Sequence, residues 1–151
     1  MSQFCGAHRV PRAGLDPVDD AESAVALVRL AMTSPPTAET IVLLLDADHR
    51  GRTIVVVDGT ADDDAVVAVV ETLAEAAAAS GEPGALVVAS VRLGRGPDAA
   101  DADRWLEASD LAAAAGVELL EWFVVEADND AADAVAWCPR DLLAEPPRWS
   151  P

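Results

Sequence analysis

Apolar and polar positions alternate in blocks along the chain, and the length of each block separates strands from helices. Three mostly apolar runs, at residues 40–45, 85–94 and 117–125, have the length of strands that are buried on both faces. A fourth run, at 53–57, follows the polar segment 46–52. The first and fourth runs are therefore predicted to pair as an antiparallel hairpin.

The first predicted helix lies before this hairpin. Asp16 followed by Pro17 is typical of a helix start, because Asp favours the N-cap and Pro favours the first helical position. We expect the helix to run to about Met32, since Pro35 and Pro36 cannot continue it.

Two further helices are predicted downstream of the hairpin. Thr60 is expected to cap one of them, with acidic residues 62–64 at the positive end of its dipole. The next is expected to run from about Ala99 until Gly116. Helical spacing gives the first an apolar face of Val66, Val69, Val70, Leu73 and Ala77 and the second a stripe of Ala102, Trp105, Ala108, Ala112 and Ala115.

The order helix, hairpin, helix, strand, helix, strand predicts an α/β (α+β) fold with helices flanking a mixed β-sheet. The later strands are expected to be joined by right-handed crossovers, and a short element is expected around 135–137. Residues 16–137 are predicted to form one domain after a flexible N-terminal tail at 1–15. The proline-rich segment 138–151 is expected to be a strap over the sheet or a tail. The apolar residues Leu142 and Trp149 favour the strap.

Charge and composition restrict the partners and the location of the protein. The chain of 151 residues has 27 acidic and 10 basic residues and a formal net charge of −17. Nucleic acid is disfavoured, because proteins bind phosphate backbones through Lys and Arg. Two cysteines are too few for a secreted disulfide framework. The sequence also lacks an apolar run long enough for a membrane span or a signal peptide, so we expect a soluble cytoplasmic protein.

Ordinary catalytic and metal motifs are weak in this sequence. Ser90 ends a strand but lacks the flanking glycines of a nucleophile elbow, which favours a structural serine. The acidic run 128–133 lacks the glycine and the glutamate of a calcium loop and is expected to be a solvated loop. The possible zinc ligands lack the close paired spacing of a zinc site. They are Cys5, His8, His49 and Cys138.

A phosphate cradle is the other candidate site. The segment RLGRG follows a strand and precedes a helix, so Arg92 and Arg95 could hold an anion there. Asp98 and Asp101, in the predicted first turn of that helix, would repel the same anion. The two acids are better explained as a cap that stabilises the helix start by roughly 1 kcal/mol.

Several segments together resemble the RadC-like branch of the JAB/MPN (JAMM) family. ETIVLLLDADHRGRTIVVVDGT resembles the family's strand ending in Leu-Asp, its turn, its second strand and its Gly-Thr. ALVVASVRLG, PDAAD and LLEWFVV resemble the strand, the helix opening and the closing strand that follow. The resemblance spans about residues 16–125. It implies a JAB/MPN-like, cytidine-deaminase-like layered sandwich.

In that family the strand ends in His-x-His-Pro and the helix opens with Ser-x-x-Asp, so that two His and one Asp hold zinc. An upstream Glu handles the proton of the metal-bound water. Carried over by position, Asp101 alone matches a ligand, and Glu39 lies about one residue out of step with the glutamate. Ser90 and Arg92 stand at the two histidine positions, Leu93 at the proline and Asp98 at the serine. Glu121 and Trp122 replace an Asp-His pair that often follows in RadC-like proteins.

The resemblance therefore implies a degenerate domain without catalysis, metal or cofactor, acting as a structural or protein-interaction module. Its expected partner is another protein or a second copy of the chain, and Trp122 or Trp149 could mark a contact surface, although a core or strap position is favoured for both. Two alternatives stay open. One is a zinc-dependent isopeptidase or hydrolase whose ligands come from His49, Glu39 and Asp101. The other is a small anion or nucleotide binder that uses Arg92 and Arg95.

Overall fold

The sheet forms the centre of the molecule. The computed structural model describes residues 3–4, 10–81 and 84–149, and in these ranges six strands make one sheet in the order β1-β6-β5-β4-β2-β3. The strands are β1 Gln3–Phe4, β2 Glu39–Leu45, β3 Gly51–Asp58, β4 Ala85–Leu93, β5 Glu118–Ala127 and β6 Val135–Trp137. Strands β4 and β5 are parallel, and the other pairs are antiparallel. The predicted mixed sheet and the β2–β3 hairpin are confirmed.

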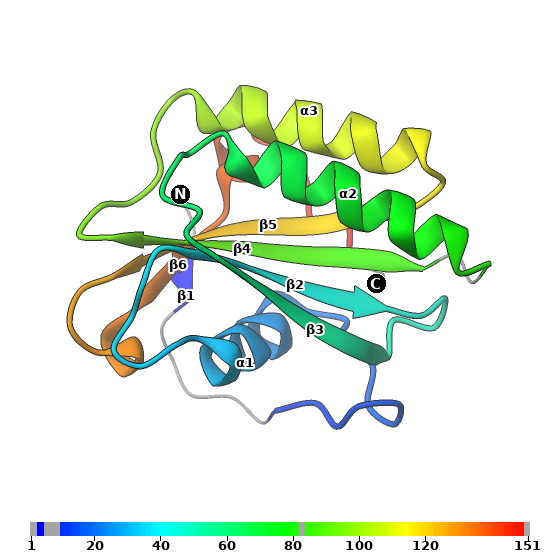
Figure 1. Ribbon diagram of the computed structural model, residues 1–151, viewed down its shortest axis with the longest axis horizontal. Helices are drawn as coiled ribbons and strands as arrows, with labels where there is room; N and C mark the ends of the chain where they lie inside the picture. Colours follow the sequence, from blue (N-terminus) through cyan, green and yellow to red (C-terminus); the bar gives the residue numbers. More distant parts are fainter. Residues whose placement is uncertain (1–2, 5–9, 82–83, 150–151) are drawn as a thin grey trace.

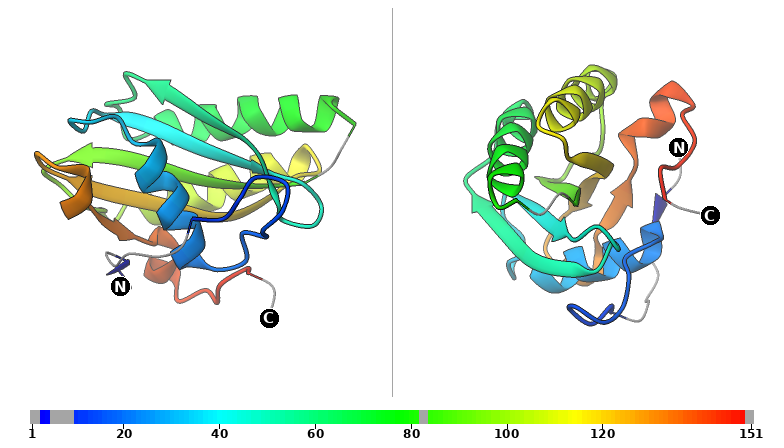
Figure 2. Two further views of the ribbon diagram at one scale, coloured as in Figure 1. Left: turned by 90° about the horizontal axis from the view of Figure 1, so that it is seen from below. Right: turned by 90° about the vertical axis from the view of Figure 1, so that its right-hand side faces the viewer.

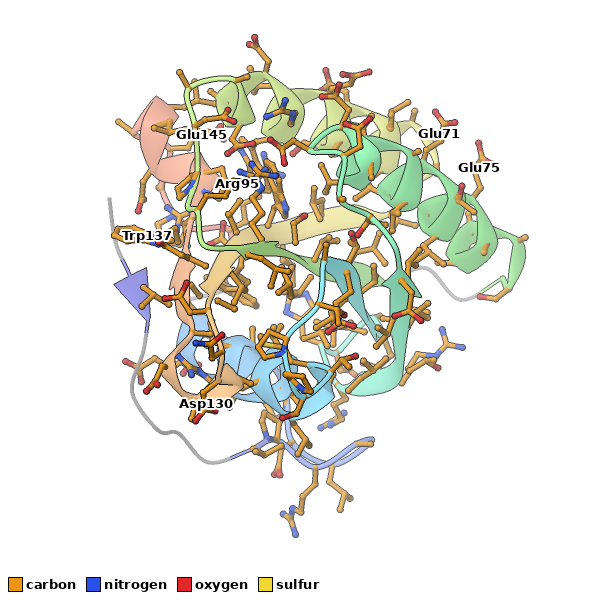
Figure 3. The ribbon with its side chains drawn as sticks, turned by 60° about the vertical axis from the view of Figure 1, so that its left-hand side comes forward. Glu71, Glu75, Arg95, Asp130, Trp137 and Glu145 are labelled. Atoms are coloured by element: carbon orange, nitrogen blue, oxygen red, sulfur yellow. The ribbon has the colours of Figure 1, made fainter. Side chains whose placement is uncertain are left out.

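Helices cover both faces of the sheet. Helices α2 (Ala65–Ala79) and α3 (Asp101–Ala114) lie side by side on one face, and α1 (Ala21–Ala31) packs on the other (Figures 1 and 2). On α2, Glu71 and Glu75 point away from the sheet (Figure 3). The α/β class with flanking helices is therefore as the sequence predicts.

The two cores follow from the alternation of side chains along the buried strands. In β4, Val87 and Ala89 belong to the cluster under α1, whereas Leu86 and Val88 belong to the cluster under α2 and α3. Trp105 and Trp122 are the largest buried side chains of the second cluster. A strand buried on both faces needs apolar residues at every position, which is why the sequence has continuous runs here.

Two predicted helix caps are wrong. Asp20 caps α1, since its Oδ1 accepts a hydrogen bond from the Ser23 N–H at 2.7 Å, whereas the Asp16 carboxylate accepts from Arg12. Thr60 does not cap α2, because its hydroxyl pairs with that of Thr40 at 2.8 Å. The acids at 62–64 consequently precede the helix instead of forming its first turn.

The C-terminal segment lies against the sheet and α3. It begins with the 3₁₀ helix η2 (Pro139–Leu143), and Trp149 packs against the core under α1. The Arg148 guanidinium donates to the Leu119 carbonyl of β5 at 2.8 Å and lies 4.3 Å from the centre of the Trp105 ring. Leu142, expected as an anchor, is instead 43% exposed. In a 3₁₀ helix only one side faces the protein, and here Arg140 is on that side.

Part of the predicted flexible tail at 1–15 falls at 1–2 and 5–9, outside the described residues. Within the tail, β1 pairs with β6, and the Gly14 N–H donates to the Gly51 carbonyl at 3.1 Å. In the ranges that the structure describes, no helix is long and apolar enough to cross a membrane.

Candidate functional site

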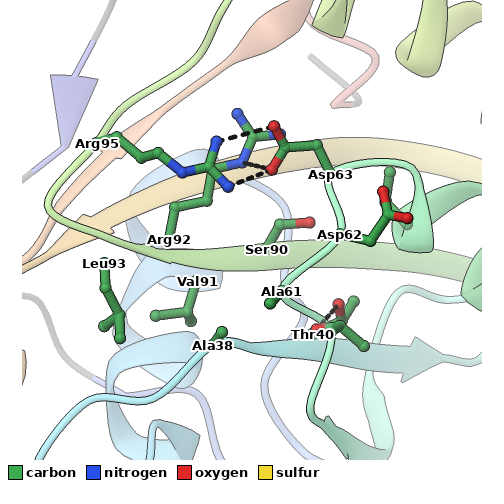
Figure 4. Close-up of a pocket in the computed structure, with 12 residues that line it drawn as sticks. Ala38, Thr40, Ala61, Asp62, Asp63, Ser90, Val91, Arg92, Leu93 and Arg95 are labelled. Carbon is green, nitrogen blue, oxygen red and sulfur yellow. Dashed lines mark hydrogen bonds and ion pairs between the residues drawn. The ribbon is translucent and has the colours of Figure 1, made fainter.

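The candidate site lies where β4 ends, beside the loop before α2 and the start of α3. A pocket of about 180 Å³ opens there (Figure 4). Its wall includes the hydroxyls of Thr40 and Ser90, the carboxylate of Asp63 and the guanidinium groups of Arg92 and Arg95. The alternation along β4 directs Ser90 and Arg92 to the face covered by α2 and α3.

A buried ion pair joins β4 to α3. Arg92 is 3% exposed and Asp101, the first residue of α3, is fully buried. The two terminal nitrogens of Arg92 donate to the two carboxylate oxygens of Asp101, each at 2.8 Å. Arg92 also donates to the Gly96 carbonyl at 3.3 Å and lies 5.9 Å from the centre of the Trp122 ring. Such a bidentate pair is the strongest geometry available to a guanidinium and a carboxylate.

The Asp101 carboxylate accepts hydrogen bonds from further donors. Its Oδ2 also accepts from the Asp98 N–H and its Oδ1 from the Arg104 guanidinium, both at 2.8 Å. Burial alone would raise the pKa of Asp101, but the hydrogen bonds from Arg92, Asp98 and Arg104 outweigh it and lower that pKa. Each oxygen accepts two hydrogen bonds, so Asp101 stays ionised.

Asp63 extends the network to the surface. Its Oδ2 accepts from Arg95 at 2.8 Å, and its Oδ1 lies 3.4 Å from Nε of Arg92. The hydrogen bond from Arg95 is the main cause that lowers the pKa of Asp63. Arg104 in turn contacts Asp64 at 2.8 Å. Both arginines proposed for an anion are thus already paired with carboxylates.

The other positions matched to the family motif have structural contacts. Ser90 accepts a hydrogen bond from the Trp122 indole at 3.0 Å, and Leu93 is 49% exposed. Asp98 stands before the helix, where its Oδ1 accepts from the Ala100 N–H at 2.9 Å. Ala100, and not Asp98, occupies the N-cap position of α3. Even so, Asp98 and Asp101 make the two reciprocal hydrogen bonds of a capping box, since the Asp98 N–H donates to Asp101 in return. The predicted pairing of the two acids at the helix start is therefore present, and Asp101 is also the partner of Arg92.

The alternative zinc ligands are not brought together. Glu39 pairs with Val91 across β2 and β4, so it points to the α1 face, opposite to Asp101. Its carboxylate accepts from the N–H and the hydroxyl of Thr33, both at 2.8 Å. His49 lies in the hairpin turn at the other end of β2, with φ of 62°. The alternation of side chains along β2 separates Glu39 from Asp101, and the length of β2 separates both of them from His49.

Metal-ligating side chains do not gather elsewhere in the described ranges either. Among those residues, no group of three or more His, Cys, Asp and Glu could hold a metal ion. Cys138 is buried, and Cys5 and His8 lie outside the described residues. In the acidic loop, Asp130 accepts from the Ala132 N–H at 2.9 Å and begins the 3₁₀ helix η1 (Ala131–Asp133).

A second buried ion pair was not predicted from the sequence. Glu121 of β5 is fully buried, and its Oε1 accepts from Arg140 of η2 at 2.9 Å and 3.1 Å. Burial raises the pKa of Glu121 despite the opposing attraction of Arg140, and it also raises the pKa of the adjacent Cys138 thiol. Trp122, expected as a core residue or a contact surface, is fully buried in the core. A lone carboxylate within an apolar strand was the available signal for this pair.

No known protein family model matches the chain, and no curated protein matches it. The function is therefore inferred from the geometry of the pocket and of the ion pairs beside it.

Proposed function

We propose that this protein is a degenerate, non-catalytic RadC-like JAB/MPN domain that acts in the cytoplasm as a structural or protein-interaction module. The resemblance of residues 39–60, 85–94, 97–101 and 119–125 supports the family. The observed order of hairpin, helix, strand, helix and strand is compatible with it. These two features support the family, but they do not bear on whether the domain is catalytic.

The non-catalytic part of the proposal rests on the Arg92–Asp101 pair. By the resemblance, a zinc ion would need ligands at positions 90, 92 and 101. Position 92 holds a guanidinium, which has no lone pair to offer a metal and would repel a divalent cation. Both oxygens of Asp101 already accept hydrogen bonds from Arg92. The residues present therefore do not fit a metal, and the ion pair takes the place of a metal in linking β4 to α3.

The two alternatives have less support. A divergent zinc enzyme would need Glu39 and Asp101 on one face of the sheet, but the strand pairing directs them to opposite faces. A small anion or nucleotide would need positive charge at the pocket. Asp63 and Asp101 neutralise Arg92 and Arg95, and Asp62 adds another carboxylate to the pocket wall.

Metal analysis of two proteins tests the proposal. After dialysis, the purified wild-type chain is expected to hold no stoichiometric zinc. In Ser90→His/Arg92→His, two imidazoles would stand beside an Asp101 released from its guanidinium, and we expect this variant to acquire zinc. Adding Asp101→Asn to the double variant is the matched control, and it should abolish the gained zinc.

Elemental analysis and circular dichroism supply the readout, so that zinc is compared only between folded proteins. One zinc per wild-type chain would overturn the proposal. A folded double variant that binds no more zinc than its Asp101→Asn control would also contradict it, because positions 90, 92 and 101 would then not form an emptied metal site.

A further inference from the structure

Strand β3 forms one edge of the sheet, and most of its residues are exposed. Strand β3 is last in the strand order and pairs with β2 on one side, and within the described part of the chain no strand pairs with its other side (Figure 2). Ile54 and Val56 are 41% and 39% exposed. Positions 53–57 hold neither charge nor proline, the features that normally prevent edge-to-edge pairing.

The hydrogen bonds at the end of the hairpin show which backbone groups face outward. The Gly59 N–H donates to the Ala38 carbonyl, so the backbone N–H and C=O groups of Gly59 point toward β2. Because the backbone groups of successive residues in an antiparallel strand point to opposite sides, those of Val55 and Val57 also point toward β2. The N–H and C=O groups of the even-numbered residues 54, 56 and 58 therefore face away from the sheet.

We propose that a second copy of this chain pairs with this edge, antiparallel and about a two-fold axis at Val55. Ile54 then lies opposite Val56 of the second copy, and the outward backbone groups of both strands meet in hydrogen-bonded pairs. Val55 lies opposite its own copy in a non-hydrogen-bonded pair. The two six-stranded sheets become one continuous sheet.

Charge and symmetry favour a second copy over a foreign strand. A two-fold contact requires that if residue i meets residue j, then j meets i. Arg52 and Asp58 are the charged positions that flank the apolar run, and Arg52 stands at the β-bulge where β3 shifts register against β2. In this register each end of the contact brings Arg52 of one copy beside Asp58 of the other. The Gly14–Gly51 hydrogen bond ends the available edge on the Arg52 side, because the loop at Gly14 lies there. This inference rests on the proposed function, in that it names the partner of the interaction module.

A disulfide trap tests the register directly. In a Cys5→Ser background, Val55→Cys should give a covalent dimer on mild oxidation, since directly opposite residues in a non-hydrogen-bonded pair lie about 4.5 Å apart at Cα. Thr53→Cys is the matched control, because its two copies would lie about 13 Å apart, too far for a disulfide. Non-reducing electrophoresis of the folded proteins measures both.

Charge reversal tests the same register without a cross-link. Arg52→Glu alone and Asp58→Arg alone each bring like charges together twice, so each should weaken dimerisation roughly tenfold. Mixing the two single variants restores opposite charges at both contacts, and the mixture should dimerise as tightly as the wild type. Leu30→Glu, at an exposed position of α1, is the control that should leave dimerisation unchanged. Sedimentation equilibrium measures each dissociation constant.

A wild-type chain that is monomeric at high micromolar concentration would overturn the inference, including the case in which a foreign strand occupies the edge. Cross-linking through Val56→Cys instead of Val55→Cys would overturn the register. These failures are separate from failure of the proposed function: a zinc-free monomer rejects the dimer alone, whereas a zinc-bound dimer rejects the non-catalytic assignment alone.

Discussion

The two buried arginine–carboxylate pairs have the same chemistry and different surroundings. Asp101 accepts hydrogen bonds from Arg92, Arg104 and a backbone N–H, and its pKa is lowered. Glu121 depends mainly on Arg140, and its pKa is raised because burial outweighs that partner. The balance between burial and hydrogen bonding therefore differs between the two sites, lowering the pKa of Asp101 and raising that of Glu121.

This difference assigns different structural roles to the two pairs. Arg92–Asp101 joins β4 to the start of α3 at the candidate site, within a network that reaches the surface through Asp63. Arg140–Glu121 attaches the C-terminal segment to β5, where Arg140 also donates to the Glu145 carbonyl at 2.8 Å. The first pair therefore connects a strand end to a helix start at the pocket, and the second holds the C-terminal segment against an inner strand of the sheet.

Asp101→Asn should give the largest loss of stability. It leaves Arg92 buried without its main counter-charge, and removing one partner of such a pair costs about 3 kcal/mol or more. Urea denaturation at neutral pH measures the free energy of unfolding. Asp103→Asn, at an exposed position of the same helix turn, should change it little. Equal effects of the two substitutions would show that the network contributes no stability.

Arg140→Met should cost less, about 2 kcal/mol, because the stranded Glu121 can take up a proton in place of its partner. The same denaturation experiment measures the change, with Arg12→Met as the control, since Arg12 forms an exposed pair with Asp16. If Arg140→Met destabilises the chain more than Asp101→Asn, then the comparison of the two carboxylates is wrong.

The smallest expected effect is a change in how the free energy of unfolding depends on pH. Because the folded chain holds the Glu121 proton more tightly than the unfolded chain, Glu121 reduces stability as the pH rises above its ordinary pKa of 4.5. Asp101 and Asp63 act in the opposite direction, since their contribution is lost as the pH falls below 3.8.

Glu121→Gln should therefore gain stability relative to the wild type between about pH 5 and pH 8. Denaturation at both ends of this range gives the difference, and the exposed Glu118→Gln is the control on the same strand. A wild-type chain that instead gains stability relative to the variant across this range would show that Arg140 outweighs burial.

The sequence predicted what depends on local pattern. The apolar runs gave the hairpin and the buried strands, because burial on both faces demands continuous apolar residues. Asp-Pro is a strong local signal that predicts a helix start at Asp16, but Asp20 offers the same capping oxygen closer to the apolar face and caps α1. Local rules cannot choose between two acids when tertiary packing sets the first buried turn.

The ion pairs depend on long-range placement, so only part of each pair can be predicted from the sequence. The resemblance brought positions 92 and 101 to the same site but left their contact unstated. The partner of Glu121 comes from η2, whose position is fixed only when the segment folds back along β5. A buried charge within an apolar run shows that a partner is needed, and the fold supplies its identity.

The contact between the C-terminal segment and β5 has a consequence for synthesis of the chain on the ribosome. Arg140 follows Glu121 by 19 positions, so translation produces the strand well before the side chain that neutralises it. A nascent chain that stalls in this interval leaves one backbone edge of β5 unpaired, and unpaired strand edges make incomplete chains prone to aggregation. Completion of this layer of the sheet therefore waits until Arg140 has been synthesised.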